Sequence, residues 1–286
     1  MDVIIQSNAE VAAQTAADLI ARALSAKPDL VLGLATGCTM EPVYDRLVQL
    51  HQAGLDFSRC RTFNLDEYVG LAADDPCSYH YFMRQRFFDV VNIDRRNTHL
   101  PDGMAEDLEA ECENYERLIA AAGGIDLQLL GIGLNGHLGF NEPPSVFRSR
   151  TRVQTLSQVT RSQNAPLFPT PRQVPQRAIT MGVETILEAR HCLLLATGLD
   201  KADIVARAIE GPPTAVITAT ALQLHPACTI VLDEAAAGSL RENNHYQRRV
   251  PEQNVSPAAQ AIATQDNNGN LQHPAPSKIP LLADKS

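Results

Sequence analysis

The amino-acid sequence predicts an α/β fold with a mostly parallel central sheet that is covered by helices on both faces. Short runs of β-branched residues or leucine alternate with longer amphipathic stretches along most of the chain. Such alternation is typical of βαβ units, because parallel strands need helical crossovers between them. The chain has 286 residues, of which 44% are hydrophobic and 20% are charged, and this composition excludes a wholly disordered protein.

The first predicted helix covers residues 8–25, where Val11, Ile20, Leu24 and other apolar residues fall at helical spacing. Pro28 and the aspartate after it end this helix. Farther along, we assign apolar runs to strands and longer stretches with one apolar face to helices. The elements predicted in this part of the chain are a strand at 30–34, a helix at 40–52, a strand at 61–65, a glutamate-rich helix at 105–121 and a strand at 125–131.

In the last third of the chain, the runs HCLLLAT at 191–197 and CTIVL at 228–232 predict two further buried strands. The amphipathic stretches between them predict helices over residues 200–209 and 214–222. The spacing of strands and helices is again that of βαβ units, so these strands should join the same sheet.

The C-terminal part of the sequence differs from the rest. From residue 250 onward it is rich in Gln, Asn, Pro, Ala and Ser and loses its periodicity. It has too few apolar residues to offset the entropy of ordering the chain. We therefore expect one compact domain over residues 1–249 and a polar, flexible tail over 250–286, whose end could dock through Ile279, Leu281 and Leu282.

The balance of charge argues against two classes of partner. Lys and Arg number 24 and Asp and Glu number 33, so the formal net charge is −9. An acidic chain lacks the basic surface that attracts nucleic acids and anionic membranes. The sequence also has no run of about 18 apolar residues that would span a bilayer. We expect neither nucleic acid nor membrane as a partner.

The six cysteines are scattered, and none belongs to a Cys-x-x-Cys pair. The sequence therefore predicts neither a zinc site nor a redox motif. The N-terminus does not have the pattern of a secretory signal. Free thiols in a chain without such a signal are typical of the reducing cytoplasm, where we expect the protein to be located.

Residues that could bind a ligand or catalyse a reaction follow the predicted strands. Ligands bind at the carboxyl edge of a parallel sheet, where such residues come together. The strand at 30–34 is followed by Ala35-Thr36-Gly37-Cys38-Thr39 and a helix. Small residues at such a turn expose backbone N–H groups that suit a phosphate, although an ordinary turn with Thr39 as helix N-cap fits as well. After the strand at 61–65, Asp66 and Glu67 could include a general base or could cap a helix.

The segment with the most candidate functional residues is GIGLNGHLGFNEP at 131–143, which comes at the end of the strand predicted over 125–131. It places four glycines in nine residues, which would be costly in a merely structural loop. It also carries Asn135, His137 and Glu142, and a histidine near a carboxylate can shuttle protons at neutral pH. Lys201 lies in the first turn of the helix predicted over residues 200–209, where its positive charge is unfavourable with the helix dipole. An anionic ligand would offset this cost. Alternatively, the side chain is simply solvated.

Six blocks of sequence carry a resemblance to a known family. They are LGLATGCT at 32–39, TFNLDEYVGL at 62–71, IDLQLLGIGLNGHLGFNEP at 125–143, SRTR at 149–152, ATGLDKA at 196–202 and LQLHP at 222–226. In this order and spacing they resemble the glucosamine-6-phosphate deaminase (isomerase) family. The resemblance implies a Rossmann-like three-layer α/β/α domain that forms a homo-oligomer. It also implies conversion of an amino-sugar 6-phosphate and water into a ketose 6-phosphate and ammonia, with neither metal nor organic cofactor.

The resemblance also implies roles for single residues. Asp66 would move the proton from C2 to C1 of the sugar, His137 would open the sugar ring, and Glu142 would orient His137. Asn135 stands where many members have Asp, and its amide could still hold His137 through a hydrogen bond. The phosphate would be bound by Thr36, Gly37, Cys38, Thr39 and Lys201.

Two other positions depart from the family pattern. Pro166 stands where members usually have a phosphate-binding arginine, and a proline offers neither charge nor donor. Arg161 and Arg172 are close enough in sequence to be candidates for a replacement. Met40 replaces a proline that commonly closes the phosphate loop, and Arg152 matches a family effector-site position.

Three other functions compete with the glucosamine 6-phosphate reaction. The galactosamine-6-phosphate branch has a loop close to GLNGHLG, although FNLDEY and GFNEP favour the glucosamine branch. A 6-phosphogluconolactonase shares the fold and a Gly-His loop but normally lacks the carboxylates of DEY and NEP. A non-catalytic phosphosugar-sensing module would need an attached DNA-binding domain, and the acidic sequence shows no helix-turn-helix pattern.

Overall fold

The computed structural model describes residues 1–168 and 174–241. Its central sheet has seven strands in the order β1-β10-β9-β6-β2-β3-β5, and all paired neighbours are parallel. The predicted α/β class and parallel sheet are confirmed. The predicted tail lies outside the described residues. The strands are β1 (Asp2–Gln6), β2 (Val31–Leu34), β3 (Arg61–Asn64), β5 (Thr98–His99), β6 (Leu127–Leu130), β9 (His191–Ala196) and β10 (Cys228–Asp233).

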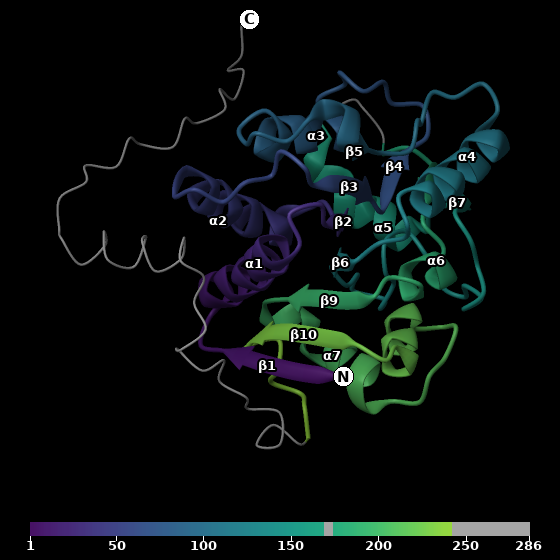
Figure 1. Cartoon of the computed structure of the whole chain (residues 1–286). Coiled ribbons are helices and arrows are strands. Elements are labelled where there is room, and N and C mark those ends of the chain that lie inside the picture. The colour runs from purple at the N-terminus through teal and green to yellow at the C-terminus, as the bar shows by residue number, and fades with distance from the viewer. Residues whose placement is uncertain (169–173, 242–286) are drawn as a thin grey trace, which may run out of the picture.

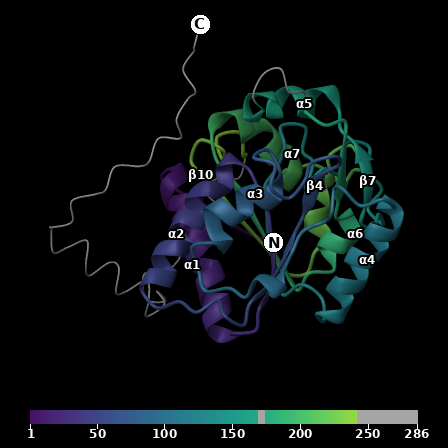
Figure 2. The same cartoon turned by 90° about the horizontal axis from the view of Figure 1, so that it is seen from above.

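Helices cover the sheet on both sides (Figures 1 and 2). On one side lie α1 (Ala9–Ala26) and α2 (Glu41–Gln52), and on the other α4 (Leu108–Ala121) and α6 (Val183–Leu187). The N-terminus of α1 is fixed by Asn8, whose side chain accepts a hydrogen bond of 2.9 Å from the Val11 amide. The remaining α-helices are α3 (Tyr79–Met83), α5 (Gln158–Asn164) and α7 (Ala202–Glu210).

The middle of the sheet forms the core. Strands β2, β6 and β10 are buried along their whole length, and β9 is buried except at its first residue, His191, which explains why their sequences are mostly apolar. Alanine and leucine of α1 pack against this sheet, with Ala12, Ala16 and Ile20 fully buried. The core fixes the positions of the strand ends, and the loops that carry the predicted site residues begin at the ends of β2, β6 and β9.

The chain reverses its direction of travel across the sheet between β2 and β6. After β2 it moves outward to β3 and β5, whereas after β6 it moves the other way to β9 and β10. The loops that follow β2 and β6 therefore turn away from each other and leave a crevice at the carboxyl edge. Ligands of open α/β sheets bind at such a point.

A second sheet was not predicted from the sequence. It is antiparallel, and its order is β4 (Asp66–Tyr68), β8 (Arg177–Thr180) and β7 (Arg152–Thr155). It has a small core of its own, which includes Tyr68, Phe140, Leu156 and Phe168. Asp66 therefore lies in a strand and faces Thr180 in the ladder, so it does not cap a helix.

The helix predicted over residues 214–222 is wrong in both type and extent. Thr214 and Ile217 form an isolated bridge, and a 3₁₀-helix runs over Thr218–Leu224. The hydroxyl of Thr220 accepts a hydrogen bond from the Thr214 amide at 2.8 Å and lies 3.1 Å from the carbonyl oxygen of the same residue. Such side-chain bonds to the backbone compete with α-helix.

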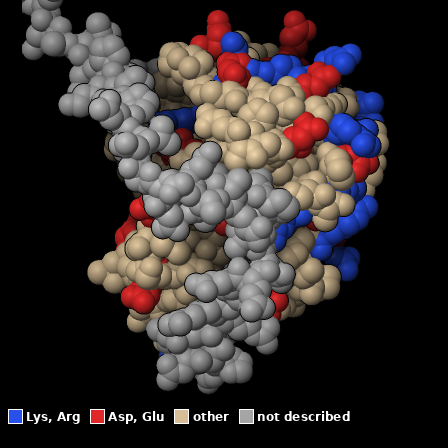
Figure 3. Space-filling model, turned by 60° about the vertical axis from the view of Figure 1, so that its left-hand side comes forward, with Lys and Arg blue, Asp and Glu red and all other residues tan. Residues whose placement is uncertain are grey.

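The surface carries charges of both signs. Figure 3 shows acidic side chains scattered over one face, with Lys and Arg along one edge and acidic residues among them. Among residues 1–168 and 174–241, no helix is long and apolar enough to cross a membrane.

A side-chain hydrogen bond from the core holds the start of the first loop of the crevice. The hydroxyl of the fully buried Tyr44 donates to the carbonyl oxygen of Ala35 at 2.5 Å. In Tyr44→Phe this buried carbonyl loses its partner, so the free energy of unfolding should fall by about 1–3 kcal/mol. Urea denaturation measures this change, with the half-buried Tyr81 mutated to Phe as the matched control. Equal stability of the two variants would contradict the assigned role of the bond.

Candidate active site

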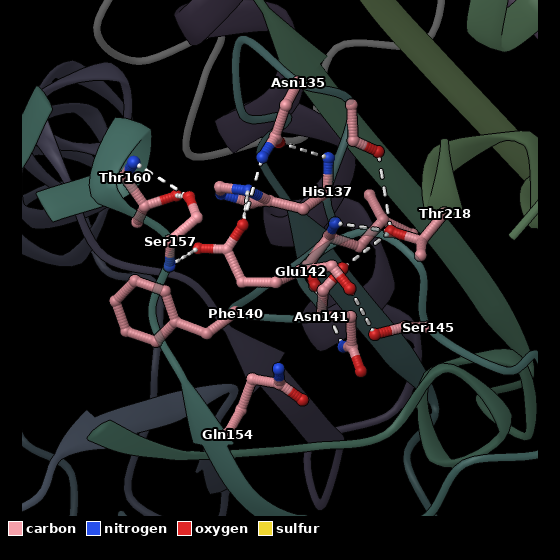
Figure 4. A network of polar contacts seen from close by, with 12 residues as sticks. Asn135, His137, Phe140, Asn141, Glu142, Ser145, Gln154, Ser157, Thr160 and Thr218 are labelled. Atoms are coloured by element: carbon pink, nitrogen blue, oxygen red, sulfur yellow. Dashed lines mark hydrogen bonds and ion pairs between the residues drawn. The ribbon is translucent and has the colours of Figure 1, made fainter. Parts of the chain in front are cut away.

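A cavity of about 340 Å³ lies in the crevice between the loops that follow β2 and β6. A volume of this order suits a small phosphorylated sugar. The predicted residues that line it are Thr36, Gly37, Cys38, Thr39, Asp66, His137 and Lys201. The other two predicted residues, Asn135 and Glu142, lie behind His137 and contact it or each other (Figure 4).

Glycines let the segment over residues 131–143, which follows β6 and is named the catalytic loop for its predicted role, fold tightly around His137. A Cβ atom on Gly133 would lie 2.4 Å from Nε2 of His137, so the imidazole occupies the space that a side chain would need. Gly139 has a φ of +54° and brings the backbone next to Asp66, whose Oδ2 is 3.3 Å from the position of a Cβ atom. The glycine-rich pattern thus brings His137 and Asp66 to one cavity.

Glu142 is held by donors from two segments of the chain. Its Oε1 accepts a hydrogen bond from the Ser157 amide at 3.0 Å, and its Oε2 accepts one from Nδ2 of Asn135 at 3.0 Å (Figure 4). A further side-chain bond comes from Thr160. Burial raises the pKa of this carboxyl, but these bonds and the nearby His137 outweigh burial and leave the pKa below its ordinary value.

His137 lies close to Glu142 without a hydrogen bond between the two side chains. Its Nδ1 is 3.8 Å from Oε2 of Glu142 and has no hydrogen-bond partner within the described part of the chain. Burial lowers the pKa of the imidazole, Glu142 raises it and Lys201 lowers it, with a net decrease. A neutral imidazole at neutral pH can accept a proton.

Asn135 does hold His137 through a hydrogen bond, as the sequence suggests, and the bond is made to the backbone amide of His137. Its Oδ1 accepts a hydrogen bond from the backbone amide of His137 at 3.2 Å, and its Nδ2 donates to Glu142. The amide side chain thus links the histidine backbone to the carboxylate. An aspartate in this place could not donate to Glu142, so the Asn is matched to its neighbour.

Asp66 is a buried carboxyl with 6% of its surface exposed. Burial raises the pKa of Asp66 to about 8, and the charge of Glu67 adds to the rise. A group with a pKa close to the working pH both accepts and releases a proton readily, which is the property of a general base or acid.

Glu67, the second carboxylate of the DEY sequence, points away from the cavity and binds backbone amides at the start of a helix. Its two oxygens accept hydrogen bonds from the backbone amides of Tyr79 and His80, at 3.0 and 2.9 Å, at the start of α3. Its Oε2 also lies 2.8 Å from Nδ1 of His80. Glu67 thus accepts from backbone donors at the start of α3, whose N-cap residue is Ser78, and the general-base role of Asp66 stays a prediction.

The predicted phosphate loop turns sharply at Gly37, which has a φ of +108°. A short 3₁₀-helix over Cys38–Met40 then leads into α2, and the α2 N-cap, Met40, makes no side-chain capping bond, so Thr39 is not the N-cap. The sequence Ala-Thr-Gly recurs after β9, where Gly198 has a φ of +94° and a 3₁₀-helix over Leu199–Lys201 follows. Two similar turns thus border the cavity.

Lys201 reaches into the site from the second of these turns. Its Nζ donates a hydrogen bond of 3.0 Å to the carbonyl oxygen of Ile132 in the catalytic loop. Burial lowers the pKa of the ammonium group, while Asp200 opposes this change. A bound anion would compensate part of the cost of burying this charge.

The replacement for the missing arginine is not found among the described residues. Pro166 lies in a short 3₁₀-helix over Ala165–Leu167, and the neighbouring Asn164 and Leu167 line the cavity. Arg161 does not line the cavity and donates to Oε1 of Gln158 at 2.5 Å. Arg172 lies outside the described residues.

Sequence reasoning missed several residues of the site. Tyr79 lines the cavity, bonds to the Thr36 side chain and stacks on Phe140 with ring planes 13° apart. Ser157 and Thr160 bind Glu142 from the start of α5. A serine that begins a predicted helix is a recognisable N-cap, but its contact with Glu142 depends on long-range folding. In the described ranges, no group of three or more His, Cys, Asp or Glu side chains could hold a metal ion.

The raised pKa of Asp66 has a consequence for stability. An unfolded aspartate ionises near pH 4, whereas Asp66 in the folded protein ionises near pH 8. Between these values the folded state holds a proton that the unfolded state has released, so stability falls as pH rises. Asp66→Asn should remove this slope and be more stable than the wild type above pH 8. Urea denaturation at pH 5, 7 and 9 tests it, with the exposed Asp29→Asn as control, and parallel curves for all three proteins would refute it.

Comparison with known proteins agrees with this geometry. The profile of the family described as glucosamine-6-phosphate isomerases/6-phosphogluconolactonase matches residues 6–231. A glucosamine-6-phosphate deaminase of an Arthrobacter species is 51% identical over 248 residues, which are 86% of this chain and 95% of the relative. One of Shewanella loihica is 52% identical over 246 residues, covering 86% of this chain and 91% of the relative.

Solved structures give the same result. One described as a monomeric glucosamine-6-phosphate deaminase matches with a TM-score of 0.82 and 47% identity, covering 84% of this chain and 100% of that one. A 6-phosphogluconolactonase from Trypanosoma brucei matches with a TM-score of 0.67 and 21% identity, covering 84% and 98%, and supports the fold alone. The chain therefore belongs to the family of glucosamine-6-phosphate isomerases and 6-phosphogluconolactonases.

Proposed function

We propose that this protein is a glucosamine-6-phosphate deaminase, which converts glucosamine 6-phosphate and water into fructose 6-phosphate and ammonia. The observation that carries the proposal is the content of one cavity. A buried carboxyl with a raised pKa, a buried imidazole and an ammonium group beside a glycine turn all line it, as Asp66, His137 and Lys201. Relatives about 50% identical over most of the chain carry this name.

The proposed chemistry begins with the closed sugar ring. His137 moves the proton that opens the ring and leaves an aldehyde at C1. Asp66 then takes the proton from C2 and returns it to C1. A second proton leaves the C2 nitrogen and another is gained by the C1 oxygen, so that the aldehyde becomes a hydroxymethyl group and the amine becomes an imine. Water adds to C2 and ammonia leaves, which gives the ketose. Glu142 provides the negative charge that stabilises His137 when it is protonated.

The proposed phosphate site also belongs to this cavity. The turn over Thr36 to Thr39 offers backbone N–H groups and two hydroxyls, and Lys201 supplies the charge. In the described residues no arginine lines the cavity, which fits the proline at position 166. We therefore expect phosphate to be bound more weakly here than in a relative that has the arginine.

Two alternatives are decided by the product. A 6-phosphogluconolactonase would hydrolyse a lactone without releasing ammonia, and the lactonases from Trypanosoma brucei and Trypanosoma cruzi, 21% and 23% identical, share the fold with this chain. A galactosamine-6-phosphate deaminase would release ammonia from the C4 epimer. A coupled ammonia assay with both amino-sugar phosphates, next to a lactonase assay, separates the three.

The assembly and location of the protein are also proposals. We expected a homo-oligomer from the family, but a solved relative is described as monomeric, so a single chain is the competing state. Sedimentation velocity at two protein concentrations distinguishes them. A cytoplasmic location is supported by the six cysteines, all of which are free thiols.

Asp66→Asn should lower kcat by about 10²–10⁴-fold, because a positioned general base contributes that much to rate. The amide has nearly the same shape as the carboxyl, so the fold should be retained. Steady-state ammonia release measures the effect, with Asp29→Asn as control. A variant that keeps more than half of the wild-type kcat would remove Asp66 from the mechanism.

Lys201→Ala should raise KM for glucosamine 6-phosphate about 10–100-fold, since a charge-assisted hydrogen bond is worth about 1.5–3 kcal/mol. The exposed Lys27→Ala is the control. Conversely, Pro166→Arg should lower KM by a similar factor if the arginine contact is missing. An unchanged KM in Pro166→Arg would show that another group already makes the phosphate contact of the missing arginine. Equal use of free glucosamine and glucosamine 6-phosphate would contradict the assignment of a phosphosugar substrate.

A further inference from the structure

Arg152 connects the second sheet to the segment that carries Glu142. It is the first residue of β7, and its Nη1 donates to Oδ1 of Asn141 at 2.8 Å. Its Nη2 donates to Oγ of Ser145 at 3.0 Å, and the Ser145 hydroxyl donates in turn to the carbonyl oxygen of Glu142 at 2.6 Å. Figure 4 shows Asn141 and Ser145 near each other, on the side of Glu142 that faces away from Ser157. One guanidinium thus bridges the residues before and after the carboxylate.

The acceptors of this bridge are themselves fixed. Asn141 is fully buried, and its Nδ2 donates to the carbonyl oxygens of Leu138 and Met181 at 2.9 and 2.8 Å. Its Oδ1 is therefore left for Arg152. A planar guanidinium presents two donors in fixed directions, which a lysine cannot do. The bridge ties the catalytic loop to a strand outside the main sheet.

The two side-chain oxygens of Glu142 already have partners in Ser157 and Asn135. These partners fix the carboxylate only if the backbone of Glu142 stays in place. The segment that follows has two prolines in succession, which cannot donate backbone hydrogen bonds. The arginine bridge adds to the backbone bond just beyond the prolines, in which the Ser145 amide donates to the carbonyl oxygen of Ala215 at 3.1 Å.

We propose that Arg152 is a positioning residue for the reaction: it bridges Asn141 and Ser145 and so keeps the carboxylate of Glu142 next to His137. The proposal rests on the proposed function, and it assigns this arginine to internal hydrogen bonds that position Glu142 and not to the binding of an effector. The resemblance matches its position to that of an effector ligand, whereas both of its terminal nitrogens are committed to internal hydrogen bonds here.

The environment of His137 predicts the direction of the effect. Glu142 raises the pKa of the imidazole and Lys201 lowers it, and Asp66 and Asp200 are the other charged groups that line the cavity. Without the bridge, the carboxylate is free to move away from His137. The pKa of His137 should then fall, and the acidic limb of the pH–rate profile should move to lower pH.

The first experiment compares Arg152→Gln and Arg152→Lys with Arg177→Gln. Arg177 lies on the neighbouring strand β8 and lines the same surface cavity as Arg152. We expect kcat to fall about tenfold in both Arg152 variants with little change in KM, because small misplacements of a catalytic group are costly. Arg177→Gln should behave as the wild type. Normal kcat in Arg152→Gln would overturn the proposal, and normal kcat in Arg152→Lys would overturn the bridging geometry.

The second experiment asks whether Arg152 acts through Glu142. In a Glu142→Gln background, Arg152→Gln should cause little further loss of kcat, since the carboxylate that it positions is already gone. Fully additive losses would show that Arg152 acts elsewhere. Should Arg152→Gln fail to fold, Ser145→Ala removes one arm of the bridge and should show the same changes on a smaller scale.

The third measurement does not need the substrate. Nuclear magnetic resonance of labelled histidine gives the pKa of His137 in the free protein. We expect a lower pKa in Arg152→Gln than in the wild type and no shift in Arg177→Gln. This shift would support the positioning role even if glucosamine 6-phosphate proved not to be the substrate, whereas an unchanged pKa would overturn the role.

Discussion

The burial of charge is the constraint on which the site depends. Asp66, His137 and Glu142 are each at most 9% exposed, although Asp66 and His137 also line the cavity. Ionised groups in such places are costly unless donors or opposite charges surround them. The hydrogen-bond donors and charges around each group therefore determine whether it is ionised, and the fold places these donors and charges.

The two carboxyls of the site, Asp66 and Glu142, differ in their surroundings and therefore in their pKa. Burial dominates at Asp66, whose pKa rises to about 8. At Glu142 burial is outweighed by hydrogen bonds from Thr160, Ser157 and Asn135, so its pKa falls. One carboxyl is thereby suited to exchange protons near neutral pH, and the other stays ionised beside the imidazole.

Much of the central sheet could be predicted from the sequence, because strands buried on both faces are continuous apolar runs. β5 has only two residues, too few to give a pattern. The second sheet could not be predicted for a different reason. β4 is the polar triplet Asp66–Tyr68, and its partner β8 is more than a hundred residues away, so only the folded chain brings the pair together.

The residues of the site were predicted better than their contacts. Short motifs identify Asp66 and His137, and both line the cavity. The partners of Glu142 come from the start of α5, and nothing in the local sequence places that helix against the catalytic loop. The role of Asn135 as donor to Glu142 also depends on how the loop folds back.

The site spans two hydrophobic cores of very different size. The main sheet supplies the turns at Gly37 and Gly198, while Asp66 and the partner residue Ser157 depend on the small core around Tyr68 and Leu156. Parts of a protein with few buried apolar contacts open at lower free energy than the rest. We therefore expect the small sheet to open at a lower free energy than the parallel sheet, and such an opening would displace Asp66 and Ser157 from the site.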